Sequence, residues 1–390
     1  MQPLINQDLS NFQANLLKPF LLLFSLFLFI SCNFKKQTET PSLKELSFNK
    51  ELHFDADNSE ILIGAFSGMA VDDQDHIYIA DTKLQEIHKF SPEGNYLASI
   101  GREGKGPGEF DGLNPAIKIH SNRLFVLQNN AREIDVFDTQ SNQYINTINI
   151  DNIKINENPI GSPRNIFPQG NENIIVSFVD PYFFKPKDDE AQKFVTLSEV
   201  DLKGEFISEK LLQFPTPFPT NNRLVFMEDN SINIFTADMY PDLKINSITG
   251  KIVIAKSDSL QFTEYDLTGS KISNFNTQNS LIPITDTDLD SLSSKRGDKI
   301  VKAINSTGKP SHWPAFEEFI IDTDGRYWIK QHDPWSDTQP WLIIDRSRDT
   351  KWTVNLPSDI KLYPGVGGNA YAIHESPDGL ASVYRYIFEF

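Results

Sequence analysis

Aromatic and imidazole side chains gather near the end of this 390-residue chain, where they are suited to holding a ligand. Trp313, the first of five tryptophans, directly follows His312, and Trp335 follows His332 by three positions. Aromatic planes beside polar groups suit the binding of sugars or peptides, so these four residues are candidate ligand-binding residues. Packing of the same loops against one another is the competing role. Trp328 alternates within a strand-like run and is expected in the core.

Two arginines add a candidate site for an anionic ligand. Arg102 and Arg164 each lie at the entrance of a repeated β-unit. In a ring of such units these entrances come close to the central axis, where a cation can meet an anion. Balance of the excess negative charge is the other explanation for both residues.

Motifs for catalysis or for a cofactor do not occur in the sequence. The seven histidines form no His-x-His or His-Glu-x-x-His pattern, and there is no Gly-x-Ser-x-Gly elbow. We therefore predict no catalytic residue, no metal and no cofactor, and we expect His76, His88 and His120 to face solvent. An enzyme stays open as the alternative, because a ring can gather ligands from distant segments and 53 acidic residues make carboxylate pairs unavoidable.

Two segments resemble calcium-binding and phosphate-binding loops but lack residues that those loops require. Residues 286–297 begin like a calcium loop, yet Ser291 replaces the required glycine and Gly297 replaces the required glutamate. A helix start is the better interpretation of this acidic segment. Residues 101–112 are rich in glycine, but a phosphate loop needs a following helix and Lys followed by Ser or Thr, whereas Lys105 precedes Gly106.

The elements that must position these residues are short β-strands. Residues 68–110 contain four strand-like runs separated by tight polar turns, which predicts one small antiparallel sheet. Residues 124–137 align without a gap on residues 77–90, at an offset of 47 residues. A glycine also recurs in the last hairpin turn of three units, at Gly94, Gly204 and Gly269, where a positive φ is expected.

Six such units can be counted, and they predict an all-β fold, a six-bladed β-propeller. The units begin near residues 68, 114, 162, 246, 314 and 367. The last unit supplies three strands at most, so the N-terminal segment 43–54 is expected to close the last blade and leave no open edge. Seven blades are the competing count, because residues 171–225 are poorly periodic. A short helix is expected within residues 285–304 and could cover one mouth of the ring.

The N-terminus carries a targeting signal rather than a membrane span. Lys18 precedes twelve apolar residues, 19–30, which are too few to cross a bilayer. Ser31 before Cys32, the only cysteine, resembles the lipobox of bacterial lipoproteins, although Phe29 stands where leucine is usual. This resemblance implies a signal peptide at 1–31, lipidation of Cys32, a tether at 32–42 and a propeller at 43–390. It places the protein in the bacterial cell envelope, facing the periplasm or the exterior.

Charge excludes one class of partner. The net charge of −17 argues against binding to nucleic acid and against broad contact with anionic lipid, so membrane contact is expected only through the lipid anchor.

Residues 68–110 resemble an NHL-type repeat, and residues 319–357 resemble the late blades of six-bladed propeller lipoproteins from Bacteroidetes-type bacteria. The resemblance implies a six-bladed ring but no single activity, since such proteins range from binding scaffolds to lyases and lactonases. We predict a non-enzymatic, monomeric scaffold that presents loops at one propeller mouth to a protein, peptide or glycan. A metal-assisted lyase or lactone hydrolase is the alternative.

Overall fold

Alternation of apolar and polar residues between tight turns makes this chain fold as short antiparallel strands. Leu43–Phe390 forms one unit in the computed structural model, whereas the predicted signal peptide, Cys32 and the tether lie outside the described residues. The structure describes residues 43–55, 63–128, 133–150, 154–155, 158–159, 161–170, 172–180, 193–216, 219, 223–228, 231–248, 250–277, 281–375 and 381–390.

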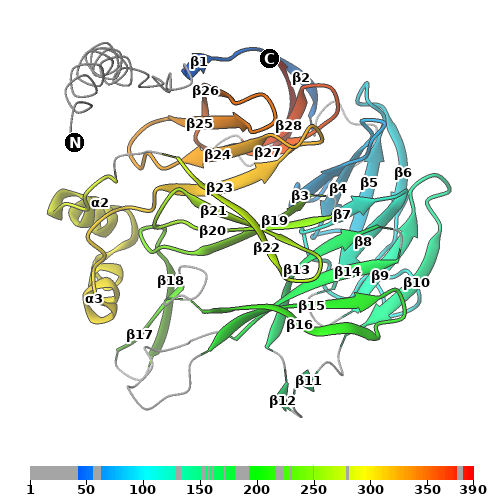
Figure 1. Cartoon of the computed structure of the whole chain (residues 1–390), viewed down its shortest axis with the longest axis horizontal. Coiled ribbons are helices and arrows are strands. Elements are labelled where there is room, and N and C mark those ends of the chain that lie inside the picture. Colours follow the sequence, from blue (N-terminus) through cyan, green and yellow to red (C-terminus); the bar gives the residue numbers. More distant parts are fainter. Residues whose placement is uncertain are drawn as a thin grey trace, which may run out of the picture. The chain divides into compact units, whose positions relative to one another are not determined.

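Six sheets, each with four antiparallel strands and one of them with an added fifth strand, form six blades, which confirms the predicted all-β six-bladed propeller (Figure 1). Blades 1 to 3 consist of β3 (Gly68–Val71), β4 (Ile77–Asp81), β5 (Glu86–Phe90) and β6 (Tyr96–Ile100); β7 (Lys118–His120), β8 (Arg123–Leu127), β9 (Glu133–Asp138) and β10 (Tyr144–Asn149); and β13 (Ser162–Gln169), β14 (Asn173–Val179), β15 (Phe194–Asp201) and β16 (Phe206–Pro215).

Blades 4 to 6 consist of β19 (Leu243–Ile248), β20 (Lys251–Lys256), β21 (Gln261–Asp266) and β22 (Lys271–Asn276); β23 (Phe316–Ile321), β24 (Tyr327–Gln331), β25 (Thr338–Asp345) and β26 (Thr350–Pro357); and β27 (Lys361–Pro364), β28 (Asn369–Glu375), β29 (Ala381–Glu389) and β2 (Ser47–Asp55). The first strand of each blade is innermost, and the following strands step outward. The unit starts predicted near 68, 162 and 314 agree with the first strands of blades 1, 3 and 5.

The two ends of the described chain close the ring together. Strand β2 pairs antiparallel with β29, and Phe48 lies opposite Phe388. This confirms that an N-terminal strand completes the last blade, so the ring has no gap at its seam. The segment predicted as one strand is divided in the structure. Strand β1 (Leu43–Glu45) runs parallel to β26 and adds a fifth strand to blade 5.

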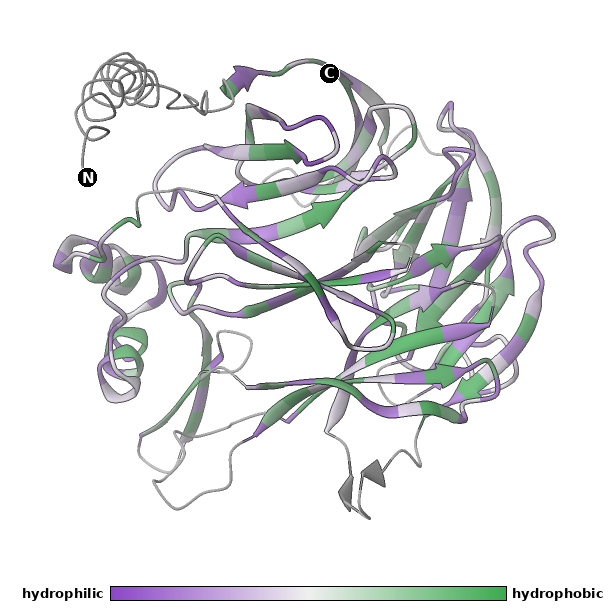
Figure 2. Ribbon diagram, in the orientation of Figure 1, coloured by the Kyte–Doolittle hydropathy of each residue, from purple (hydrophilic) through white to green (hydrophobic). Residues whose placement is uncertain are grey.

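Apolar clusters between neighbouring blades hold the ring together. Phe54 of β2 stacks on Phe90 of blade 1 with a centroid distance of 4.2 Å, which joins the last blade to the first. Trp328 and Trp352 of blade 5 pack in one cluster with Tyr386 of blade 6. Burying one large apolar side chain contributes about 1.5–3 kcal/mol to stability. The strands carry many of the hydrophobic residues, which are coloured green in Figure 2.

The hairpin turns confirm the prediction for glycine. Gly94, Gly204 and Gly269 have φ values of 88°, 85° and 81°. In the turn after β21, Oδ1 of Asp266 accepts hydrogen bonds from the N–H groups of Thr268 and Ser270 at 2.9 Å each. A β-carbon at Gly269 would lie 2.5 Å from the carbonyl oxygen of another segment, so glycine is required there for two reasons.

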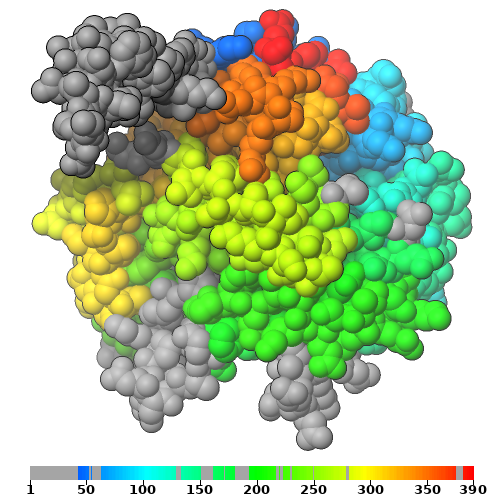
Figure 3. All heavy atoms as spheres, viewed as in Figure 1, coloured from blue at the N-terminus to red at the C-terminus, as the bar shows by residue number. Residues whose placement is uncertain are grey.

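An insertion packs beside blades 4 and 5, where Figure 3 shows its helices in yellow next to the yellow-green blade 4. It comprises the hairpin of β17 (Arg223–Glu228) and β18 (Ser231–Thr236), followed after blade 4 by α2 (Asp286–Arg296) and α3 (Asp298–Thr307). Its own core contains residues from the hairpin, the segment between the hairpin and blade 4, α3 and the loop before blade 5, namely Leu224, Met239, Tyr240, Ile300, Ile304 and Trp313.

The acidic segment at residue 286 is a helix start, as predicted. Thr285 caps α2 in a reciprocal capping box with Asp288. The helix predicted within 285–304 is therefore a pair of helices. A further small hairpin pairs β11 (Lys154–Ile155) with β12 (Asn158–Pro159). Neither α2 nor α3, the helices of the described part of the chain, has the length and apolarity needed to cross a membrane.

Candidate functional site

The two faces of the ring are defined by its innermost strands. We call the side where β19 and β23 begin the entry face, and the side where they end the exit face. A cavity of about 440 Å³ opens at the entry face between blade 4, blade 5 and α2, and we call it the aromatic cavity. Helix α2 lines this cavity and does not line the cavities along the central channel.

Three of the candidate residues from the sequence meet in the aromatic cavity. The rings of Trp313 and His332 stack with a centroid distance of 4.7 Å, and Trp313 meets Trp335 edge-on at 6.3 Å. Trp313 is buried, whereas Trp335 is 50% exposed. Nζ of Lys295 lies 5.5 Å from the centroid of Trp335 and orders this exposed ring through a cation–π contact.

The carboxylate of Glu317, at the start of β23, organises the polar wall. Its Oε1 lies 2.9 Å from Nδ1 of His332 and accepts a 2.9 Å hydrogen bond from Nε2 of Gln339, while Oε2 lies 3.1 Å from Nζ of Lys330. Burial alone would raise the pKa of Glu317, but the contacts with His332, Lys330 and Gln339 outweigh it and lower the pKa to about 2. Glu317 is therefore ionised at neutral pH, and it fixes the imidazole and the amide.

Buried polar atoms of this wall are left unsatisfied. Nε2 of His332 and Oε1 of Gln339 have no hydrogen-bond partner among the described residues, and Nδ1 of His332 lies near Glu317 without forming a directed hydrogen bond. The two residues are 7% and 6% exposed, and both line the aromatic cavity. A buried polar atom without a partner costs about 1–3 kcal/mol. Such atoms in a cavity wall are positioned to be completed by a bound molecule.

Cations surround the same cavity. Lys244 of β19 and Lys295 and Arg296 of α2 line it. Arg296 is held by a hydrogen bond from its Nη1 to the carbonyl oxygen of Thr236 in the hairpin. In a chain with a net charge of −17, this local group of cations makes the cavity mouth different from the rest of the surface.

The other three candidates lie elsewhere. Arg164 lines a second entry-face cavity of about 510 Å³, which we call the arginine cavity. Arg102 is exposed and forms a 2.6 Å ion pair with Glu109 of the same glycine-rich turn. His312 is exposed and lies 2.9 Å from the hydroxyl of Ser311, outside the lining of the aromatic cavity.

Sequence reasoning missed three residues of these cavities. Glu317 and Gln339 reach the aromatic cavity, and Arg223 reaches the arginine cavity. Pairing of β23, β24 and β25 is what brings the first two next to His332. A correct strand register would have placed them there, but no local motif marks them.

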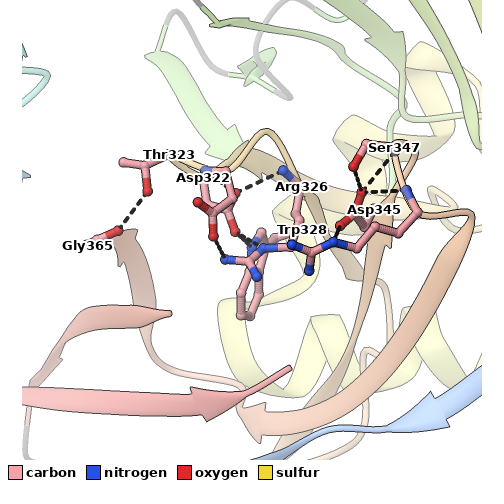
Figure 4. A network of polar contacts seen from close by, with 9 residues as sticks. Asp322, Thr323, Arg326, Trp328, Asp345, Ser347 and Gly365 are labelled. Atoms are coloured by element: carbon pink, nitrogen blue, oxygen red, sulfur yellow. Dashed lines mark hydrogen bonds and ion pairs between the residues drawn. The ribbon is translucent and has the colours of Figure 1, made fainter. Parts of the chain in front are cut away.

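The exit end of blade 5 carries a polar network of a different kind (Figure 4). Oδ2 of Asp322 accepts hydrogen bonds from Nε of Arg326 at 2.7 Å and from Nε1 of Trp328 at 2.8 Å. Its Oδ1 accepts the backbone N–H groups of Asp324 and Arg326 at 3.0 and 2.9 Å. Thr323 donates across to the carbonyl oxygen of Gly365 in blade 6, so this network ties two blades together.

The residues that the structure describes include no cluster of side chains that could bind a metal ion. No three His, Cys, Asp or Glu side chains gather there closely enough to hold an ion.

The expectation that His88 faces solvent is wrong: it is 2% exposed, and its Nε2 lies 3.5 Å from Asp81. Strand β5 is the third of four strands, and its side chains are covered by the neighbouring blade.

The protein is a six-bladed β-propeller with an inserted pair of helices, and two cavities open at its entry face. The model of the DUF5128 family, described as a 6-bladed beta-propeller, matches residues 57–280, and the chain belongs to this family. No curated protein matches the sequence.

Solved structures share the fold at low sequence identity. A protein of Bacteroides fragilis NCTC 9343, provisionally described as exported, has a TM-score of 0.52 and 10% identity, covering 89% of this chain and 99% of its own. A DUF4221 member from Bacteroides vulgatus has a TM-score of 0.50, with the same identity and coverage. The virginiamycin B lyase of Staphylococcus aureus reaches 0.41 at 12% identity, covering 88% and 99%. At these identities the likeness shows the fold alone.

Proposed function

We propose that this protein binds a glycan in the aromatic cavity. The observation that carries the proposal is the pair of buried, unpartnered atoms, Nε2 of His332 and Oε1 of Gln339, beside the exposed ring of Trp335. Nδ1 of His332 lies 2.9 Å from Oε1 of the ionised Glu317, which leaves Nε2 as the ring nitrogen for a ligand. The wall then presents an imidazole nitrogen and the amide oxygen of Gln339, and the amide oxygen requires a donor group from a ligand.

A sugar supplies the matching chemistry. A sugar hydroxyl both donates and accepts, so such groups can satisfy Nε2 of His332 and Oε1 of Gln339, and the apolar C–H face of the sugar ring packs on the plane of Trp335. A peptide backbone also donates hydrogen bonds, but it lacks the combination of several adjacent hydroxyls with a flat apolar face. The cations at the mouth, Lys244, Lys295 and Arg296, favour glycans that carry acidic groups.

The cellular location of the protein is part of the proposal. A signal peptide at 1–31 and lipidation of Cys32 would tether an NHL-type propeller, as a monomer, to the outside of the cytoplasmic membrane or to the outer membrane. The support is the sequence pattern at residues 18–32. Labelling with radioactive palmitate tests it: label is expected in the native protein and absent from Cys32→Ala. Equal labelling of both would contradict the lipid anchor.

Binding is tested with purified full-length protein in detergent, screened against arrays of glycans and of peptides and then titrated calorimetrically. We expect glycan binding that weakens at least tenfold in Trp335→Ala and in Gln339→Leu. Leu97→Ala is the matched control, since Leu97 is 48% exposed on a distant outer strand. Binding of peptides only, or equal affinity of native protein and both cavity variants, would contradict the glycan site.

A second candidate is an enzyme that acts on the same ligand, and one observation favours it. A carboxylate that orients a histidine, with the other ring nitrogen free in a cavity, is the arrangement of a general base. His332 would then take a proton from the substrate. Product analysis after incubation with each bound glycan distinguishes the two candidates. If the native protein converts the glycan and His332→Gln binds it without converting it, the protein is an enzyme. If the glycan is unchanged by the native protein, the protein is a binding protein.

A further inference from the structure

The arginine cavity holds two cations without carboxylate partners. Arg164 at the start of β13 and Arg223 at the start of β17 both line it with exposed side chains, and neither forms an ion pair with any residue that the structure describes. The carboxylate in the wall, Asp242, lies 3.2 Å from Nζ of Lys244 and accepts the N–H of Leu243 at 2.8 Å. Its charge is therefore already largely engaged.

The two guanidinium groups are close enough to affect each other. Burial and then the positive charge of Arg223 lower the pKa of Arg164, and Asp242 offsets only part of this. Two like charges at one cavity wall repel each other, which costs free energy unless an anion lies between them. Arginine is also the side chain whose planar fork matches the two oxygens of a carboxylate or phosphate.

A neutral donor completes the wall. Thr216, directly after β16, is 5% exposed and lines the cavity, and its hydroxyl has no hydrogen-bond partner among the described side chains and backbone groups. A buried hydroxyl of this kind is costly unless it is satisfied. An oxyanion held by both arginines would accept a hydrogen bond from it.

We propose that the arginine cavity is a binding site for the oxyanion group of a small ligand, a carboxylate or a phosphate, held by Arg164, Arg223 and the hydroxyl of Thr216. The site is independent of the glycan proposal. It has its own lining, and the Asp242–Lys244 ion pair joins the two cavities, with Asp242 on the arginine side and Lys244 on the aromatic side.

The test is calorimetric titration of purified full-length protein in detergent with inorganic phosphate, with acetate and with uncharged acetamide. We expect binding of one or both anions, no binding of acetamide, and affinity that falls as salt is added. Preference for phosphate or acetate distinguishes the two sources of the oxyanion.

Variants assign the binding to the cavity. Arg164→Gln and Arg223→Gln are each expected to weaken anion binding at least tenfold, and Thr216→Val about threefold. Arg102→Gln, which removes the same charge from an exposed turn, is the matched control and keeps native affinity. Trp335→Ala also keeps native anion affinity, which separates this site from the aromatic cavity.

Two results would overturn the assignment. One is the absence of any anion binding at low salt by a native protein that is folded by circular dichroism. The other is an equal loss of affinity in Arg164→Gln and Arg102→Gln, which would show that anions respond only to overall charge. Thermal unfolding of each variant confirms that a loss of binding is not a loss of fold.

Discussion

The two ends of blade 5 use the same residue types in opposite ways. At the exit end, both oxygens of Asp322 accept hydrogen bonds, and its partners Arg326 and Trp328 are buried. At the entry end, Glu317 also lies among cationic and amide groups, but the residues beside it keep buried atoms without a hydrogen-bond partner, among them Nε2 of His332 and Oε1 of Gln339. A saturated network stabilises the fold, whereas a network with open atoms in a cavity wall is arranged for a ligand.

The largest effect is expected from breaking the saturated end. Asp322→Ala leaves the guanidinium of Arg326, which is 5% exposed, with only the exposed Asp324 as a charge partner, and it removes the acceptor of the Trp328 indole. Breaking a buried ion pair costs about 3–5 kcal/mol. Urea denaturation should show this fall in the free energy of unfolding. The control is Asp324→Ala, because Asp324 contacts the same arginine from an exposed position.

For that control we expect a loss of no more than about 1 kcal/mol. Similar losses in the two variants would mean that the network at the exit end does not stabilise the fold in the way argued here.

The charge network around Glu317 at the entry end should make the free energy of unfolding depend on pH. The pKa of Glu317 is lowered from 4.5 to about 2, so its contribution is fully present above pH 4.5 and is lost as the pH falls toward 2. Glu317→Gln should remove about 2 kcal/mol at pH 7, and the difference from the native protein should shrink between pH 4.5 and 2. Denaturation curves at several pH values measure it, and a difference independent of pH would refute the ionised network.

The exposed ring at the entry end should separate binding from stability. Trp335→Ala is expected to lower glycan affinity at least tenfold, or about 1.4 kcal/mol, because the stacking face is lost. The free energy of unfolding should change by less than about 0.5 kcal/mol, since the ring is half exposed. A large loss of stability with unchanged affinity would assign Trp335 to the fold instead.

The smallest effect concerns the helix that carries Lys295 and Arg296 to the cavity. Thr285 caps α2, and Thr285→Ala should cost about 1 kcal/mol. Because the helix then frays at its start rather than at the cavity, glycan affinity should fall less than twofold. Thr285→Ser, which keeps the capping hydroxyl, is the control for stability. An affinity loss as large as that of Trp335→Ala would show that α2 acts as one unit with the site.

The repeated pattern was sufficient to predict the ring but not the site. Period-two alternation and the glycine turns at Gly94, Gly204 and Gly269 are local, so the blades and their closure could be predicted. Trp313, His332 and Trp335 were found by type, because aromatic residues beside polar groups are uncommon outside a core. Glu317 and Gln339 depend on the register of three strands, and Arg223 depends on the position of an inserted hairpin. Such placement is set by long-range packing.

The most direct test of the account is a crystal structure of the protein with a glycan identified on the array. The account predicts a sugar ring on the exposed face of Trp335, with hydroxyl groups within hydrogen-bond distance of Nε2 of His332 and Oε1 of Gln339. A glycan bound elsewhere on the propeller, with both atoms still unpartnered, would contradict it.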